Sequence, residues 1–154
     1  MSELASESTS QGGGGTAELH ARVRQFYAHQ MALSEGGMVD RWAATFTENA
    51  VFEDSFTPEP LHGRAAIRDS VAEGIERIVL QGLDFRHWFG EFQLEAVADG
   101  GVLARYRALA MATPSGGRVA VQGHAVCQDH LVPQGDGWLV RRRSLQFDGM
   151  LSDQ

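Results

Sequence analysis

Lysine is absent from this sequence of 154 residues, and all 13 basic residues are arginines. Without a lysine amine, neither Schiff-base chemistry nor covalent attachment of pyridoxal phosphate is possible. Cysteine occurs once, at Cys127, which excludes an internal disulfide and a thiolate metal cluster. Because Cys127 stands in the strand-like run HAVCQDHL, we expect it to pack as a small hydrophobic residue, with a catalytic thiol as the alternative.

Long apolar runs and an excess of basic charge are also missing. No run of about 18 apolar residues occurs, so neither a transmembrane helix nor a membrane partner is expected. The N-terminus lacks the basic and apolar regions of a signal peptide, which favours a cytoplasmic protein. The net charge of −7 argues against nucleic acid as a partner, because phosphate binding needs a basic surface.

Motifs for common cofactors are absent as well. The sequence has no glycine-rich phosphate loop, no dinucleotide fingerprint and no G-x-S-x-G nucleophile elbow. Its six histidines lack close metal-ligand spacings such as H-x-H or H-E-x-x-H. We therefore expect no cofactor and no metal, although two histidines and a carboxylate that are distant in sequence could still assemble a site in space.

The part of the sequence with positive signals begins with a tail and three helical patterns. Residues 1–16 are rich in Ser, Glu and Gly and are predicted to form a disordered tail, so a single domain is expected over residues 17–150. Apolar residues recur at helical spacing in the first part of that domain. They predict a helix from residue 19 that ends at Gly36, a short helix over 38–46, a strand over 50–54, a proline-rich loop and a helix over 64–80.

Beyond Gly82 the apolar period changes from helical to alternating. The turn sequences ADGG, TPSGG and QGDG separate four long runs, which we interpret as an antiparallel meander over residues 84–97, 101–113, 117–132 and 137–148. Three helices followed by a curled antiparallel sheet define an α+β domain.

Alternation along the sheet places one carboxylate, Asp129, on an apolar face together with Val119 and Val121. A buried carboxylate is costly unless it is paired or protonated. On the preceding run, Tyr106 shares a face with a series of alanines, which indicates either a closely packed helix or a cavity over the sheet. A β-bulge would exchange the two faces.

Two further titratable groups stand on faces that we interpret as inward. Asp54 lies between Phe52 and Phe56 in the short strand segment, and we expect all three to face a pocket. His87 likewise lies between two phenylalanines, with a core histidine as the alternative. Burial would raise the pKa of a carboxylate and lower that of a histidine, bringing both toward neutrality. Asp54, His87 and Asp129 are therefore the candidate catalytic groups for general acid–base chemistry.

The neighbouring charges are expected to lie outside that pocket. Glu53 points to the opposite face from Asp54, so it is predicted to be solvated or paired with an arginine. Arg141, Arg142 and Arg143 are predicted to form a solvated edge, although one of them could pair with an inward carboxylate.

Residues 17–149 resemble the nuclear transport factor 2-like superfamily. The segment FTENAVFEDSFTPEPLHGRAAIRD is similar to bacterial ketosteroid isomerase, which implies that Asp54 is a catalytic base and that Gln30 falls near the place of an oxyanion-hole tyrosine. The segment FRHWFGEFQLEAVADGGVLARY resembles scytalone dehydratase, which implies that His87 is a catalytic histidine. Asp129, in GHAVCQD, then falls where that dehydratase has a substrate-contacting asparagine.

The HW element, the ATP-x-GG hairpin and the final D-x-LV…GDGWLV-R-R are similar to those of SnoaL-like proteins from actinobacterial aromatic polyketide clusters. This resemblance implies a cone-shaped fold, a homodimer, and a cofactor-independent cyclase, dehydratase or isomerase that acts on a hydrophobic, polyketide-like small molecule. Asp54 would be the base, and His87 the acid or proton shuttle. The candidate substrate contacts are Tyr27, Trp42, Phe52, Phe56, Phe89, Tyr106 and His124.

Two other functions remain open at this point. One is a non-catalytic binding or accessory role, as in proteins that hold unstable intermediates or in the small subunits of ring-hydroxylating dioxygenases. The other is epoxide opening by a carboxylate–Arg–carboxylate set, as in relatives of limonene epoxide hydrolase. The mixed polar and apolar outer face of the sheet, with Leu109, Met111 and Val126, also favours a homodimer.

Overall fold

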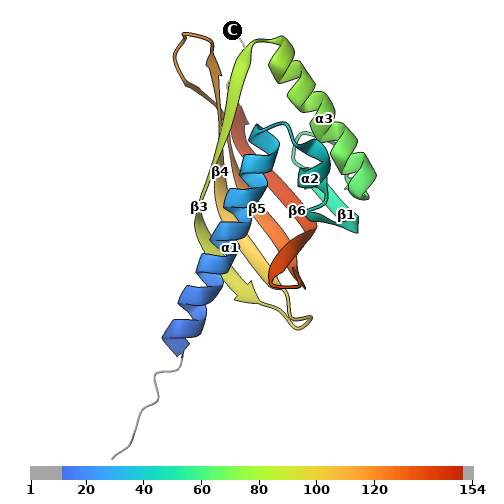
Figure 1. Cartoon of the computed structure of the whole chain (residues 1–154), viewed down its shortest axis with the longest axis vertical. Coiled ribbons are helices and arrows are strands. Elements are labelled where there is room, and N and C mark those ends of the chain that lie inside the picture. The colour runs from blue at the N-terminus through green and yellow to red at the C-terminus, as the bar shows by residue number, and fades with distance from the viewer. Residues whose placement is uncertain (1–11, 151–154) are drawn as a thin grey trace, which may run out of the picture.

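The computed structural model describes residues 12–150, in which helices cover one face of a curved sheet (Figure 1). Helix α1 spans Gly12–Glu35, α2 spans Val39–Ala43 and α3 spans Arg64–Leu80. Of the tail predicted over residues 1–16, residues 1–11 lie outside the described part, and residues 12–16 belong to α1. None of the described helices is long and apolar enough to cross a membrane.

A six-stranded sheet forms the second layer, with the strand order β2-β1-β6-β5-β4-β3. Its neighbouring strands are antiparallel, as predicted, apart from β1 and β6, which run parallel. The predicted α+β class is therefore confirmed. The strands are β1 (Phe46–Asp54), β2 (Leu61–His62), β3 (Leu83–Ala96), β4 (Val102–Pro114), β5 (Ala120–Gln134) and β6 (Gly137–Met150).

The second helix is shorter than its apolar spacing predicts, because it ends at Ala43 and strand β1 begins at Phe46. Thr45 Oγ1 donates a hydrogen bond of 2.6 Å to the Trp42 carbonyl, which closes the last helical turn. Phe46 then pairs with Val140 of β6 and is fully buried. Pairing with a strand almost 100 residues away along the chain decides this boundary, and a local helical period cannot reveal it.

A β-bulge in β5 changes which residues face the helices. Gly123 and Val121 pair with consecutive residues of β4, so Gln122 is the extra residue. Val121 is consequently 45% exposed, the nearby Val119 is more exposed still, and Gln122 faces the helix side. The predicted inward orientation of Val119 and Val121 is therefore wrong, whereas Asp129, beyond the bulge, is buried as predicted.

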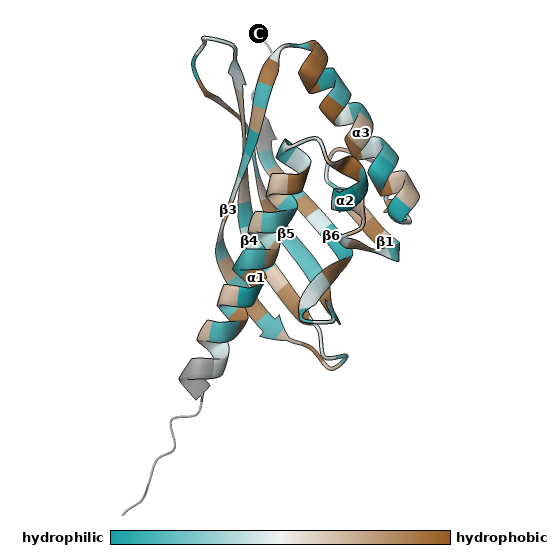
Figure 2. Ribbon diagram, in the orientation of Figure 1, coloured by the Kyte–Doolittle hydropathy of each residue, from teal (hydrophilic) through white to brown (hydrophobic). Residues whose placement is uncertain are grey.

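The hydrophobic core lies between α1, α2 and the sheet. Val23 and Tyr27 on α1 are buried against sheet residues such as Ala104 and Leu131. Figure 2 shows apolar and polar segments alternating along α1 and α3, as expected for helices with one apolar face. Helix α3 contributes one described residue, Ile67, to the fully buried set, so its other apolar side chains face a less completely filled space.

Candidate functional site

That space is a cavity of about 660 Å³ bounded by the three helices and the inner face of the sheet. Its floor is made of very small residues, because Ala108 pairs with Ala125, and Ala110 pairs with Gly123, across β4 and β5. The alanine face that sequence alternation identified therefore lies under a cavity rather than under a closely packed helix. A volume of this size is typical of sites that hold a small organic molecule.

The cavity walls are mainly aromatic and aliphatic. Trp42 of α2 and Phe52 of β1 line one part, and Phe85 and Phe89 of β3 line another. Helix α3 adds branched aliphatic side chains from above the floor, namely Val71, Ile75, Ile78 and Val79. A flat floor between apolar walls suits a planar apolar ligand.

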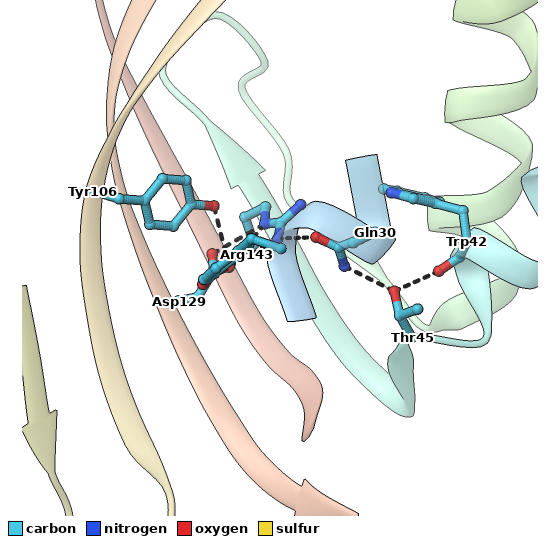
Figure 3. A network of polar contacts seen from close by, with 7 residues as sticks. Gln30, Trp42, Thr45, Tyr106, Asp129 and Arg143 are labelled. Atoms are coloured by element: carbon cyan, nitrogen blue, oxygen red, sulfur yellow. Dashed lines mark hydrogen bonds and ion pairs between the residues drawn. The ribbon is translucent and has the colours of Figure 1, made fainter. Parts of the chain in front are cut away.

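Asp129 lies at the centre of a buried polar network behind the cavity (Figure 3). Its side chain is 0% exposed. Its Oδ2 accepts hydrogen bonds from Tyr27 Oη at 2.7 Å and from Tyr106 Oη at 3.1 Å. Arg143 donates to the same carboxylate from Nε at 3.0 Å and from Nη2 at 2.8 Å. The cost of burying a carboxylate is thus offset by an opposite charge and by hydrogen bonds.

Gln30 of α1 extends this network toward the helices (Figure 3). Arg143 Nη2 donates to Gln30 Oε1 at 2.7 Å, and Gln30 Nε2 donates to Thr45 Oγ1 at 2.8 Å. Because the Thr45 hydroxyl hydrogen goes to the Trp42 carbonyl, Thr45 Oγ1 must accept from Gln30, which determines the orientation of the Gln30 amide. The Arg143 guanidinium also lies 5.2 Å from the centre of the Phe46 ring.

Burial controls the protonation states of this network. Burial raises the pKa of Tyr27 and of Tyr106 well above the usual value, and the Asp129 carboxylate raises both further, so both phenols remain hydrogen-bond donors. Burial alone would lower the pKa of Arg143, but Asp129 outweighs it and the guanidinium keeps its charge. Burial, followed by the charge of Asp129, raises the pKa of Cys127 to about 12, so this thiol stays protonated and is a poor nucleophile.

His87 is the second polar feature of the cavity. Its ring packs edge-on against Phe85, with the ring centres 4.6 Å apart, and also contacts Phe89. Its backbone N–H donates to Glu35 Oε1 at 2.9 Å. Within residues 12–150, no side chain or backbone group is hydrogen-bonded to its imidazole nitrogens. Burial lowers the pKa of His87, with Glu35 opposing and Arg143 adding to the shift, so the imidazole is neutral at pH 7 and available to a ligand.

The structure brings together most of the site residues that the sequence predicted. His87, Tyr106, Trp42, Phe52 and Phe89 line the cavity. Two others lie directly behind it, since Asp129 and Tyr27 are joined to the cavity-lining Tyr106 through the buried network.

Asp54 does not point into the cavity, and this expectation is wrong. Its Oδ1 accepts hydrogen bonds from the backbone N–H groups of Phe56 and Thr57, each at 2.8 Å, and its Oδ2 accepts one from Thr57 Oγ1 at 3.0 Å. Strand β1 ends at Asp54, so the carboxylate turns back to close the following turn instead of continuing the strand alternation. Phe56 is 60% exposed, packs on Phe147 and is not a cavity wall either.

The remaining predicted residues lie outside the cavity. His124 is on the outer face of the sheet and pairs with Asp148, so its expected contact with substrate is not supported by its position. Glu53 pairs with Arg142 at 2.8 Å, as one of the two expectations for it stated.

Arg143 and Gln30 are polar cavity-lining residues that the sequence did not identify. Arg143 lies in a run of three arginines that suggests a solvated edge, yet it alternates with Leu145 and Phe147, which also line the cavity. That alternation is the signal that indicates its inward orientation. Gln30 follows Val23 and Tyr27 at helical spacing on the buried face of α1, which is the corresponding signal for it.

Among the described residues, no group of three His, Cys, Asp or Glu side chains is placed to hold a metal ion.

The geometry defines an α+β protein in which three helices and a curved sheet enclose an apolar cavity, with a buried polar network behind it. The family model described as a SnoaL-like domain matches residues 15–144, and the chain belongs to this family. The fold matches that of a Novosphingobium aromaticivorans protein described as NTF2-like with a cystatin-like fold, which confirms the predicted fold. None of the curated proteins matches the chain.

Three solved structures illustrate the relationship. Aln2 from a Streptomyces species is 32% identical, with 85% of this chain and 91% of Aln2 covered and a TM-score of 0.79. ActVI-ORFA from Streptomyces coelicolor is 28% identical, with 88% and 99% covered and a TM-score of 0.79. A Catenulispora acidiphila protein solved in complex with S-DNPA is 30% identical, with 86% and 95% covered and a TM-score of 0.75.

Proposed function

We propose that this protein is a cofactor-independent enzyme that transfers protons on a flat, polyketide-like small molecule, with His87 as the acid–base group. One observation carries the proposal: a neutral imidazole without a side-chain partner among the described residues lines an apolar cavity of about 660 Å³. A general base must lie within reach of the proton it removes and titrate near the working pH. The relative solved in complex with S-DNPA supports a small-molecule ligand for the cavity.

The proposed chemistry needs a single group that accepts and returns a proton. Neutral His87 removes a proton from a substrate carbon next to a carbonyl, which leaves an enolate. The imidazolium then returns the proton to another carbon in an isomerisation or to a leaving hydroxyl, which departs as water, in a dehydration. In a cyclisation, the enolate carbon attacks a second carbonyl and the alkoxide formed takes the proton.

The buried network supports this reaction from behind. The Asp129 carboxylate is fully surrounded by donors, so we assign it a positioning role through Arg143 and Tyr106 rather than a proton-transfer step. Tyr106 gives its hydroxyl hydrogen to Asp129, which leaves the phenol oxygen and ring to contact the ligand.

Turnover by two variants distinguishes His87 from the base that the sequence predicted. His87→Gln should lower kcat/KM for an aromatic polyketide intermediate by about 100-fold or more, because general acid–base catalysis contributes about 10²–10⁴-fold. Asp54→Asn should stay within about threefold of wild type, since an Asn side-chain oxygen can still accept the two backbone hydrogen bonds of the turn. A wild-type rate for His87→Gln together with an inactive Asp54→Asn would reverse this assignment.

Binding without catalysis is the second candidate function. It is favoured by the observation that Asp129, Arg143 and Gln30 largely satisfy one another, which leaves His87 as the main reactive group in the cavity. In that case His87→Gln would leave ligand affinity unchanged and no turnover would be measured for either protein. Epoxide opening by a carboxylate–Arg–carboxylate set is less well supported, because within residues 12–150 Arg143 pairs with a single carboxylate.

The outer face of the sheet supports a homodimer as the working form. Three large apolar residues on this face have relative solvent exposures above 40%, namely Trp88, Val121 and Val126. In a row across the sheet, Trp88 is adjacent to Leu109, which pairs with His124. Large apolar side chains grouped on one exposed face mark an interaction surface, and a second copy of the chain would cover it.

A further inference from the structure

Arg143 retains one terminal nitrogen, with its two N–H groups, after its buried partners are counted. Its side chain is 4% exposed and lines the cavity. Nε and Nη2 donate to Asp129, and Nη2 also donates to Gln30. No described residue accepts a hydrogen bond from Nη1, and Figure 3 accordingly shows one terminal nitrogen of Arg143 outside the dashed contacts. Nη1 is therefore the nitrogen that Arg143 can offer to a ligand.

A single free nitrogen determines what kind of group Arg143 can bind. Two-point recognition of a carboxylate or phosphate uses two guanidinium nitrogens side by side. The pair formed by Nε and Nη2 is already occupied by Asp129, and Asp129 also balances the charge of Arg143. What remains is a single nitrogen, Nη1, which suits one oxygen atom carrying partial or full negative charge.

We propose that Arg143 Nη1 binds one carbonyl, enolate or phenolate oxygen of a planar aromatic ligand, and that this contact sets the ligand preference of the cavity. The rings would lie over the alanine and glycine floor formed by Ala108, Ala110 and Gly123. His87 lines the same cavity and is close enough for Arg143 to affect its ionisation. An oxygen held at Nη1 would thus share the cavity with the acid–base group. The proposal relies on the proposed function only in taking this cavity as the substrate site.

Equilibrium dialysis with 2-naphthol, naphthalene and 2-naphthoate tests this preference. The three probes share one ring system and differ in the oxygen group they present. Wild-type protein should bind 2-naphthol about tenfold or more tightly than naphthalene, because naphthalene has no oxygen and a hydrogen bond to a charged donor is stronger than one between neutral groups. It should also bind 2-naphthol more tightly than 2-naphthoate, because a second free guanidinium nitrogen for two-point recognition of a carboxylate is lacking.

Two variants separate the oxygen contact from the cavity itself. The paired variant Asp129→Asn/Arg143→Met removes both buried charges together, and it should bind 2-naphthol and naphthalene within about threefold of each other. Ala110→Leu fills the floor and should weaken both probes by similar factors while keeping their ratio. The proposal is overturned if wild type shows no preference, if the folded paired variant keeps a tenfold preference, or if 2-naphthoate binds most tightly.

A structure of the wild-type protein with 2-naphthol provides a test that does not depend on the variants folding. The naphthol oxygen should lie about 3 Å from Nη1, and an oxygen placed elsewhere in the cavity would refute the proposal. Binding requires no turnover, so failure here leaves the acid–base role of His87 intact. A failed turnover test likewise leaves the ligand preference measurable.

Discussion

At the residue scale, the ion pair of Asp129 and Arg143 organises the interior of this protein. Both side chains are almost completely buried, and they meet as direct neighbours across β5 and β6. Tyr27, Tyr106 and Gln30 satisfy most of their remaining hydrogen-bonding capacity. Such a pair does little for stability when compared with apolar residues of the same volume, but it is costly to break.

Removing one partner should therefore be strongly destabilising. Arg143→Met should lower the free energy of unfolding by about 3–5 kcal/mol, because it leaves the Asp129 carboxylate buried without a counter-charge. Arg68→Met is the matched control, since the Arg68–Asp40 pair at 2.7 Å is solvent-exposed and its loss should change the free energy of unfolding far less. Urea unfolding of both variants measures the difference, and equal losses would mean that the buried pair is not special.

His87 should make stability depend on pH in a predictable direction. Burial lowers its pKa in the folded protein below the ordinary value of about 6.5, so the unfolded chain takes up a proton first as the pH falls. The contribution of His87 to the free energy of unfolding is therefore greatest above about pH 6.5. It decreases as the pH falls below that value, until the imidazole of the folded protein is protonated as well.

Urea unfolding between about pH 7.5 and pH 5.5 tests this dependence. His87→Gln should lose less stability than wild type across this range. His62→Gln should follow wild type, because His62 is exposed. If the free energy of unfolding changed with pH equally in wild type and in His87→Gln, the pKa of His87 would not be lowered in the folded protein as its burial implies.

At the scale of elements, helix α3 serves the cavity more than the core. Ile67, in its first turns, is fully buried, whereas Ile75 and Ile78 in its second half line the cavity. Val79 and Leu80 at its end are largely exposed. Helical periodicity correctly predicted this helix, but periodicity cannot tell whether an apolar stripe meets other side chains or a ligand space.

Replacing isoleucine by alanine at two positions of α3 should show the difference between a core position and a cavity position. Ile67→Ala should cost about 2–5 kcal/mol, the usual range for deleting a fully packed side chain. Ile75→Ala should cost clearly less, because its side chain already borders open volume, and it should enlarge the cavity for bulkier ligands. Chemical denaturation of both variants provides the comparison, and an equal cost at Ile75 would indicate that the cavity is closed in solution.

At the scale of the whole molecule, the outer sheet face is the interface of the two-fold dimer that we propose. Trp88→Glu and Val126→Glu should each convert a dimer into a monomer, because a charge placed in a buried apolar interface is poorly solvated. Light scattering after size exclusion measures the mass directly. Leu80→Glu provides the control, since Leu80 is at least as exposed but lies on α3, away from this face. A wild-type monomer, or a dimer unaffected by both sheet variants, contradicts the proposed interface.

The sequence by itself determined most of the secondary structure, apart from β2 and the boundary between α2 and β1. It also determined the α+β class and the resemblance that the family match later confirmed. It also identified His87 and Asp129 as inward groups, because strand alternation is a local property of the backbone. It failed at Asp54, where the strand ends and the side chain closes a turn, and at Val121, where a bulge shifts the alternation.

Only the tertiary structure decided which groups meet. In the sequence, Arg143 belongs to a run of arginines that is predicted to form a solvated edge. The pairing of β6 with β5 places it opposite Asp129, to which it donates a hydrogen bond. Gln30 acquires its role when α1 packs over that pair. The physical reason is that periodicity reports the direction of a side chain relative to its own element. A partner, a cavity or an interface depends on which distant element that side chain faces.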